Sequence, residues 1–152
     1  MDAPYPPPRT AGPGPPRTAA GWGARWPGPP RRELLEANAA FYAAFEAADL
    51  DAMSDVWLHE DHVVCAHPGW ASLQGWPAVA ASWFALFQGD VSMQFILTRD
   101  APVVRGDVGW VTVDENLLAG PQAQTVAAVN VFERVDGRWR LAVHHGSGIA
   151  PD

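Results

Sequence analysis

The side chains best suited to proton transfer lie on the last predicted strands. Residues 138–147 alternate between two faces of a strand, and the apolar face that begins at Trp139 ends at His145. This pattern predicts that His145 faces the interior and that His144 faces outward. The same alternation places Glu115 on an otherwise apolar face of a preceding strand. Both assignments assume that no β-bulge interrupts the strands, because one extra residue would reverse them.

A buried carboxyl group near an imidazole can act as a general acid/base pair, because each group changes the proton affinity of the other. Glu115 and His145 are therefore candidate catalytic residues. Asn130 lies on the neighbouring predicted strand and can donate a hydrogen bond to a carbonyl or accept one from a ligand hydroxyl. The alternative is a satisfied polar cluster that fixes the sheet and contacts no ligand. The sequence leaves both interpretations open.

A second candidate site lies in the loop 66–70, where a Pro-Gly pair predicts a fixed turn after a short strand. His67 is a candidate base or hydrogen-bond donor there, and Trp70 is a candidate stacking wall for a flat ligand. In the alternative interpretation the loop is a structural corner. Residues 59–62 combine two histidines with two acids, but consecutive residues of a short turn point in different directions. We therefore expect no metal site and no cofactor.

The spacing of apolar side chains predicts the elements that position these residues. The expected elements are a helix from Glu33 to about residue 48, a short helix within residues 49–57, a short strand at 62–65, a helix from Pro77 to Gly89, and strands that alternate from residue 91 onward. Two-residue hairpin turns are expected at 106–107 and 136–137. Helices followed by a meander predict an α+β domain with the helices on one face of the sheet.

Five stretches of the chain carry a family resemblance: LLEANAAFYAAFEAADL, DLDAMSDVW, HEDHVVCAHPGW, AVAASWFALF and DGRWRLAVHHGS. In this order they resemble the nuclear transport factor 2-like superfamily, especially its SnoaL-like and ketosteroid-isomerase-like branch. The resemblance implies a cone-shaped fold over residues 33–150, in which a curved antiparallel sheet and three helices on one of its faces surround a pocket. It also implies a homodimer formed through the open face of the sheet.

The resemblance further implies where a ligand would bind. Tyrosines of the first helix reach the pocket in this superfamily, so Tyr42 is a candidate ligand-binding residue; the alternative is that it lies at the edge of the helix. Trp83 and Trp139 are further candidate ligand-binding residues. Ketosteroid isomerases of this fold use an aspartate base near the end of the first strand. Cys65 or Ala66 stands at that place in this chain, which disfavours steroid isomerisation by that route.

Charge and composition limit the partners. The first 32 residues hold five arginines and one acid, and ten prolines lie within the first 30, so we expect a disordered tail over residues 1–32. Alternatively, this tail is a ligand for a proline-recognising partner protein. Residues 33–152 carry five arginines against sixteen acids, a formal charge of −11, which disfavours nucleic-acid binding. No apolar run reaches the roughly 18 residues of a membrane span, and one cysteine excludes an internal disulfide, so we expect a cytoplasmic protein without a membrane partner.

The sequence thus predicts a domain that binds a small hydrophobic molecule in a cone pocket, with no reaction assigned. One alternative is an acid/base enzyme of isomerase, cyclase or hydrolase type that acts on a carbonyl-bearing, polyketide- or steroid-like substrate. The other is a noncatalytic dimerisation module with a proline-rich interaction tail.

Overall fold

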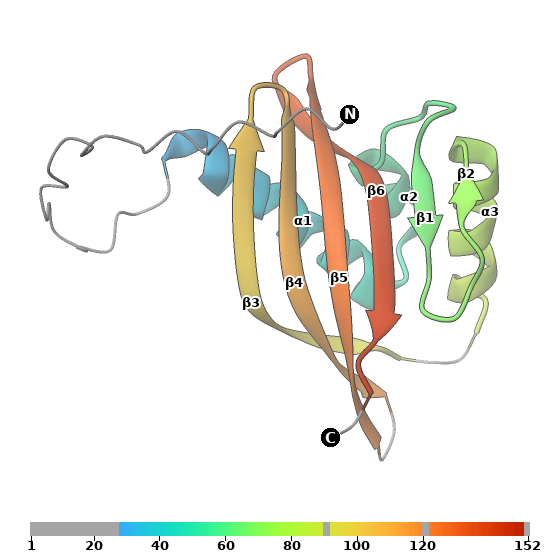
Figure 1. The fold of residues 1–152 in the computed structure, drawn as a ribbon. Helices are drawn as coiled ribbons and strands as arrows, with labels where there is room; N and C mark the ends of the chain where they lie inside the picture. The colour runs from blue at the N-terminus through green and yellow to red at the C-terminus, as the bar shows by residue number, and fades with distance from the viewer. Residues whose placement is uncertain (1–27, 90–91, 120–121, 151–152) are drawn as a thin grey trace, which may run out of the picture.

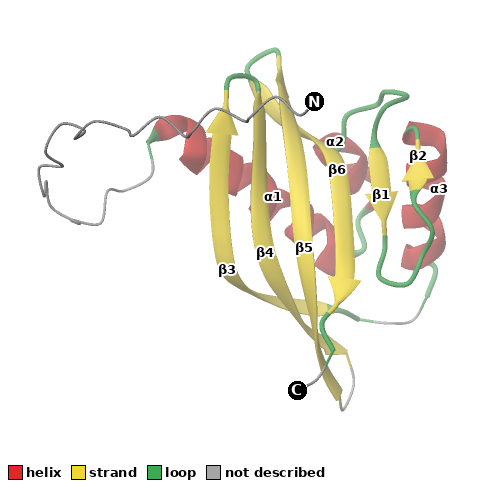
Figure 2. Ribbon diagram, viewed as in Figure 1, coloured by secondary structure: helices red, strands yellow, loops and turns green. Residues whose placement is uncertain are grey.

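The computed structural model describes residues 28–89, 92–119 and 122–150, and most of the predicted tail therefore lies outside the described residues. The elements are α1 (Pro29–Ala47), α2 (Leu50–Val56), β1 (Val64–Ala66), β2 (Leu73–Gln74), α3 (Trp76–Phe87), β3 (Gln94–Arg105), β4 (Val108–Ala119), β5 (Gln122–Val135) and β6 (Arg138–Gly148) (Figure 1). The predicted α+β architecture, with helices preceding a meander, is confirmed (Figure 2).

The strands form one curved sheet in the order β2-β1-β6-β5-β4-β3. Strands β3 to β6 are the predicted antiparallel meander, whereas β1 pairs in parallel with β6 and so makes the sheet mixed. The three helices lie behind the sheet in Figure 1, where α1 crosses the meander diagonally and α3 lies beside β1 and β2. One face of the sheet is therefore covered by helices. Among the described residues, none of the helices combines the length and apolar content needed to cross a membrane.

Helix α1 begins at Pro29, earlier than the predicted start at Glu33. Prolines suit the first turn of a helix because their missing amide hydrogen has no partner there, and their φ angle is already helical. The helix ends at Ala47 and is capped by Ala48, which adopts a left-handed conformation with φ of 50°. The next residue, Asp49, caps α2 by accepting a hydrogen bond from the backbone of Ala52 at 3.0 Å.

Aromatic rings fill the space between the helices and the sheet. Phe45 of α1 lies 4.8 Å from Trp83 of α3 and 4.7 Å from Phe95 of β3, measured between ring centroids. Phe41 lies 5.7 Å from Trp83, and both are fully buried. Edge-to-face contacts of this kind add about 0.5–1.5 kcal/mol per pair beyond the area that they bury. The interior of the cone is therefore a packed aromatic core.

A β-bulge in β6 reverses the predicted faces of the two neighbouring histidines. Val143 pairs with Val131 and Leu141 pairs with Phe132, so Ala142 is an extra residue without a partner. Past this bulge the alternation of faces is shifted by one residue. The prediction that His145 faces the interior was wrong: His145 is exposed, and His144 is buried.

Candidate functional site

Five polar side chains form a hydrogen-bonded network inside the cone. Its members are Asn38 and Tyr42 of α1, Glu115 of β4, Asn130 of β5 and His144 of β6. Each is at most 3% exposed. We call this set the interior network. It joins the first helix to three neighbouring strands, so polar groups far apart in the sequence meet at one place.

Glu115 is the ionisable end of the interior network. The hydroxyl of Tyr42 donates a 2.6 Å hydrogen bond to Oε1 of Glu115. Burial raises the pKa of Glu115 to about 7, although the hydrogen bond from Tyr42 lowers it in part. Burial, together with the adjacent carboxylate, raises the pKa of Tyr42 well above its usual value, so the phenol keeps its proton. The carboxyl group can therefore take up or release a proton near neutral pH.

Asn130 connects the two halves of the interior network. Its Nδ2 donates to Oδ1 of Asn38 at 2.8 Å and to Oη of Tyr42 at 3.0 Å, and its Oδ1 lies 2.6 Å from Nδ1 of His144. Burial lowers the pKa of His144 to about 3, so this imidazole is neutral. The amide thus uses both of its hydrogens and its oxygen within the interior network.

His67 lies beside the interior network and has its own partner. Its Nε2 is 3.0 Å from Oγ of Ser82 in α3, and its ring centroid is 4.7 Å from that of Trp83 and 6.4 Å from that of His144. Burial lowers the pKa of His67 to about 4. The Cys65 sulfur lies 3.7 Å from His67 Nε2, but burial raises the pKa of this thiol to about 12. Cys65 is therefore a core thiol and a weak nucleophile.

The structure brings together some of the predicted site residues and separates others. Tyr42, Glu115 and Asn130 meet in the interior network, with His67 and Trp83 next to it. Two others lie elsewhere: Trp139 packs under the guanidinium of Arg134 at 5.1 Å, and His145 lines a hollow on the outer face of the sheet. Trp70 is 47% exposed and lies at the edge of the site, with its ring centroid 4.9 Å from that of His67. The predicted inward orientation of Glu115 is confirmed.

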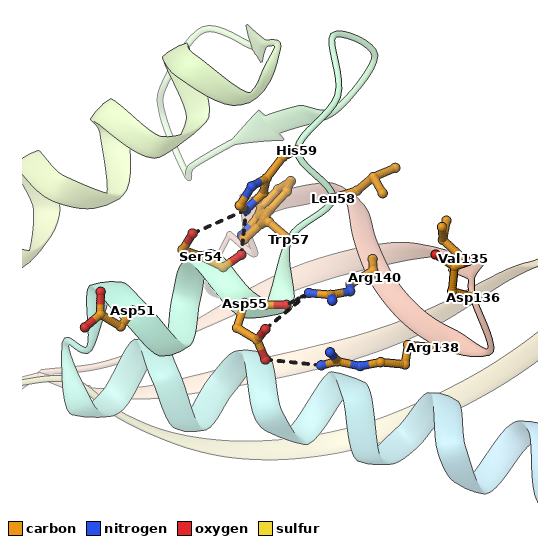
Figure 3. A pocket seen from close by; sticks show the side chains of 10 residues that line it. All are labelled: Asp51, Ser54, Asp55, Trp57, Leu58, His59, Val135, Asp136, Arg138 and Arg140. Atoms are coloured by element: carbon orange, nitrogen blue, oxygen red, sulfur yellow. Dashed lines mark hydrogen bonds and ion pairs between the residues drawn. The ribbon is translucent and has the colours of Figure 1, made fainter.

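Glu115 does not line the four main surface hollows of the described residues. The largest of the four has a volume of about 530 Å³ and lies between α2 and the β5–β6 turn (Figure 3). There Arg138 and Arg140 both reach Asp55, at 3.2 Å and 3.4 Å between the charged groups. These ion pairs hold the turn against the C-terminal end of α2, and Arg138 lowers the pKa of Asp55. Because Asp55 and Arg138 are exposed, each of these pairs contributes at most about 1 kcal/mol.

Three members of the site were missed by the sequence analysis. Asn38 stands four residues after Leu34 and three before Phe41, so the helical spacing could have identified it as an inward polar residue. No signal in the sequence marks Ser82 as the partner of His67, because that contact depends on how α3 packs against β1. His144 was assigned to the wrong face because of the bulge.

Comparison with known proteins agrees with this fold. The model of the family described as the SnoaL-like domain matches residues 34–151. This chain belongs to the SnoaL-like domain family. The predicted resemblance to the nuclear transport factor 2-like superfamily is thereby confirmed.

Three relatives of this SnoaL-like domain are informative. A candidate dehydratase of the NTF2-like family from Streptomyces avermitilis is 35% identical, with 80% of this chain and 97% of that chain covered and a TM-score of 0.76. A candidate calcium/calmodulin-dependent protein kinase type II association domain from Thiobacillus denitrificans is 38% identical, with 75% and 93% covered and a TM-score of 0.67. The F-box protein SKIP8 of Arabidopsis thaliana is 30% identical over 123 residues, which are 80% of this chain and 52% of SKIP8. The chain thus spans about half the length of that curated relative.

Proposed function

We propose that this SnoaL-like domain binds a small, largely apolar molecule inside its cone, with Glu115 and Tyr42 as the polar anchor. The observation that carries this proposal is a buried carboxyl group, 2.6 Å from a tyrosine hydroxyl, in an interior lined with aromatic rings. Burying an ionisable group costs stability, and proteins keep such groups mainly where they serve a function. Apolar walls with a few convergent polar groups are typical of small-molecule sites.

Entry of the ligand requires aromatic rings to move. None of the four surface hollows is lined by Glu115. Phe45 and Phe95 are half-buried, and the ring of Phe95 lies 5.3 Å from that of Tyr42. Rotation of these two rings would open a path to the anchor without breaking any backbone pairing.

Mass spectrometry of the purified full-length protein, first native and then denaturing, tests for a co-purified small molecule. Calorimetric titration at about pH 8 with 2-naphthalenemethanol, an apolar alcohol whose hydroxyl can donate a hydrogen bond to the Glu115 carboxylate, then tests the anchor. We expect Glu115→Gln to weaken binding by about tenfold, since hydrogen bonds to charged groups contribute about 1.5–3 kcal/mol. Glu60→Gln, a change at an exposed turn, is the matched control. Absence of any ligand in both experiments, or equal affinities of the two variants, would reject the anchor.

Acid/base catalysis is the second candidate function of the same site. Two observations favour it: the pKa of about 7 for Glu115, and the 35% identity to a candidate dehydratase. In a dehydration, the Glu115 carboxylate would accept the α-proton of a β-hydroxy carbonyl compound, and the electron pair of the broken C–H bond would form the C=C bond as the C–O bond breaks. The departing hydroxyl group would take up the proton from the Glu115 carboxyl group and leave as water, which returns Glu115 to the carboxylate. Turnover should rise through about pH 7 and be lost in Glu115→Gln, while the variant remains folded. A pH-independent rate would contradict this role.

The outer face of the sheet supports a second proposal, a homodimer. Five half-buried apolar side chains form a continuous cross-strand row on this face: Val64, Val143, Val131, Trp110 and Val103. Apolar rows on an uncovered sheet face are typical of interfaces between copies. Light scattering after gel filtration should give a dimer mass for the full chain and a monomer mass for Val131→Arg. Ala39→Arg, on the exposed side of α1, is the control that should stay dimeric.

A further inference from the structure

The protonated nitrogen of His67 follows from its neighbour Ser82. The hydroxyl of Ser82 lies 2.7 Å from the backbone oxygen of Val79 and donates its single proton there. It can therefore only accept from Nε2 of His67, 3.0 Å away, and Nε2 must carry the proton. Nδ1 of His67 is then a hydrogen-bond acceptor. The sulfur of Cys65 is 3.9 Å from Nδ1 and is at best a weak donor to it.

The interior network determines the protonated nitrogen of His144. An ionised Glu115 accepts only, so Tyr42 must donate its proton to the carboxylate and must accept from the amide nitrogen of Asn130. The amide oxygen of Asn130 then points to His144, whose Nδ1 must donate across the 2.6 Å contact. Nε2 of His144 is left as a second acceptor.

The two acceptor imidazoles lie near each other, with a buried donor beside them. The rings of His67 and His144 are 6.4 Å apart, and the indole of Trp83 lies 4.7 Å from the first and 6.3 Å from the second. Nε1 of Trp83 is buried without a hydrogen-bond partner. No arginine is among the buried polar side chains of the described residues, and the chain has no lysine. A bound anion would therefore meet Glu115 and no compensating positive charge.

We propose that the ligand of the interior is a neutral molecule with a hydroxyl group that donates its single proton to Nδ1 of His67, next to the second acceptor imidazole, His144. This inference rests on the proposed ligand-binding function and adds the chemical class of the ligand. A carboxylate or an ether offers no donor to these nitrogens, and a carboxylate also carries a charge that the interior does not balance. Phenols, enols and alcohols with an apolar body fit the site.

Calorimetric titration of the full-length protein at about pH 8 with three naphthalene probes tests the ligand class. We expect 2-naphthol to bind about tenfold more tightly than 2-methoxynaphthalene, because the ether leaves the buried acceptors without a donor, and we expect 2-naphthoate to bind most weakly. The preference for the hydroxyl should disappear in His67→Phe and persist in His62→Gln, a change at an exposed histidine. Equal binding of naphthol and its ether overturns the inference but leaves the pocket intact. If no probe binds, the proposed ligand-binding function is rejected, and the proposed ligand class is rejected with it.

The tautomers of the two histidines provide a test that needs no ligand and no variant. Long-range ¹H–¹⁵N correlation spectra at about pH 8 should show the proton on Nε2 of His67 and on Nδ1 of His144. The opposite tautomer at either ring would remove one of the acceptors and overturn the inference, even if an apolar probe binds.

Discussion

Replacing Glu115 by glutamine should make the protein more stable at alkaline pH. In the unfolded chain this carboxyl group has a pKa of 4.5, and in the fold its pKa is about 7. Between these values the folded protein binds a proton that the unfolded chain has lost, so the contribution of Glu115 to stability is greatest below pH 4.5 and falls as pH rises to about 7. Glutamine keeps the shape and accepts from Tyr42, but carries no charge at any pH.

The size of the effect follows from the shift in pKa. One pKa unit corresponds to 1.36 kcal/mol, so the rise of Glu115 from 4.5 to about 7 corresponds to a loss of about 3 kcal/mol in the folding free energy at pH 8. The side chain is 3% exposed, and solvent therefore screens little of this cost. The difference between Glu115→Gln and wild type should be small at pH 5 and about 3 kcal/mol in favour of the variant at pH 8.

Urea denaturation followed by circular dichroism at several pH values between 5 and 8.5 measures this difference. Subtracting the wild-type curve cancels the contributions of the other titrating groups, including the two buried histidines. Glu60→Gln, at an exposed position, should give a curve parallel to wild type. A Glu115→Gln curve that also runs parallel to wild type would refute the argument, because it would mean that Glu115 titrates alike in the folded and unfolded states.

Three other experiments test the packing around the site. Replacing His144 by phenylalanine should lower the free energy of unfolding in urea by about 1–3 kcal/mol, because its amide partner loses a donor, whereas His145→Ala on the outer face should change it by less than about 0.5 kcal/mol. Equal losses of unfolding free energy in these two variants would contradict the β-bulge, because they would mean that both histidines are equally buried. Gly109→Ala would place a Cβ 2.9 Å from a leucine methyl carbon of α1 and should cost about 1–3 kcal/mol, whereas the added Cβ of Gly148→Ala meets no atom closer than 3.7 Å and should be nearly neutral. The thiol of Cys65, which is fully buried, should react with a thiol reagent only after urea unfolds the protein; rapid labelling of the native state would show that the core opens.

The order of elements could be predicted from the sequence, as could the side chains of β4 and β5 that point to the interior. In both strands the alternation of apolar and polar residues is unambiguous. Glu115 interrupts an alternation of buried valines, and in β4 and β5 no bulge lies between that pattern and the residue of interest. The inward orientation of Asn130 in β5 follows from the same alternation of buried and exposed residues. The hairpin turns were also predictable, since Gly106 and Gly137 supply the positive φ angles that these turns require.

The facing of β6 could not be predicted for a physical reason. Leu141, Ala142 and Val143 are three consecutive apolar residues, so either of two alternations satisfies the burial of this strand. No glycine or proline marks the bulge at Ala142. Its position depends on how β6 pairs with β5, which is a long-range property of the sheet.

The unpaired residue Ala142 also has an evolutionary consequence. Deleting its single codon would restore regular pairing and leave His144 inward and His145 outward, because Leu141 and Val143 would then alternate as neighbours. A homologue that keeps this residue but pairs its strand without a bulge would instead turn His145 inward and His144 outward. The pairing register of β6 is thus a variable of the site, alongside residue identity. A gap-free sequence alignment of a bulged and an unbulged homologue would compare side chains from opposite sides of the sheet.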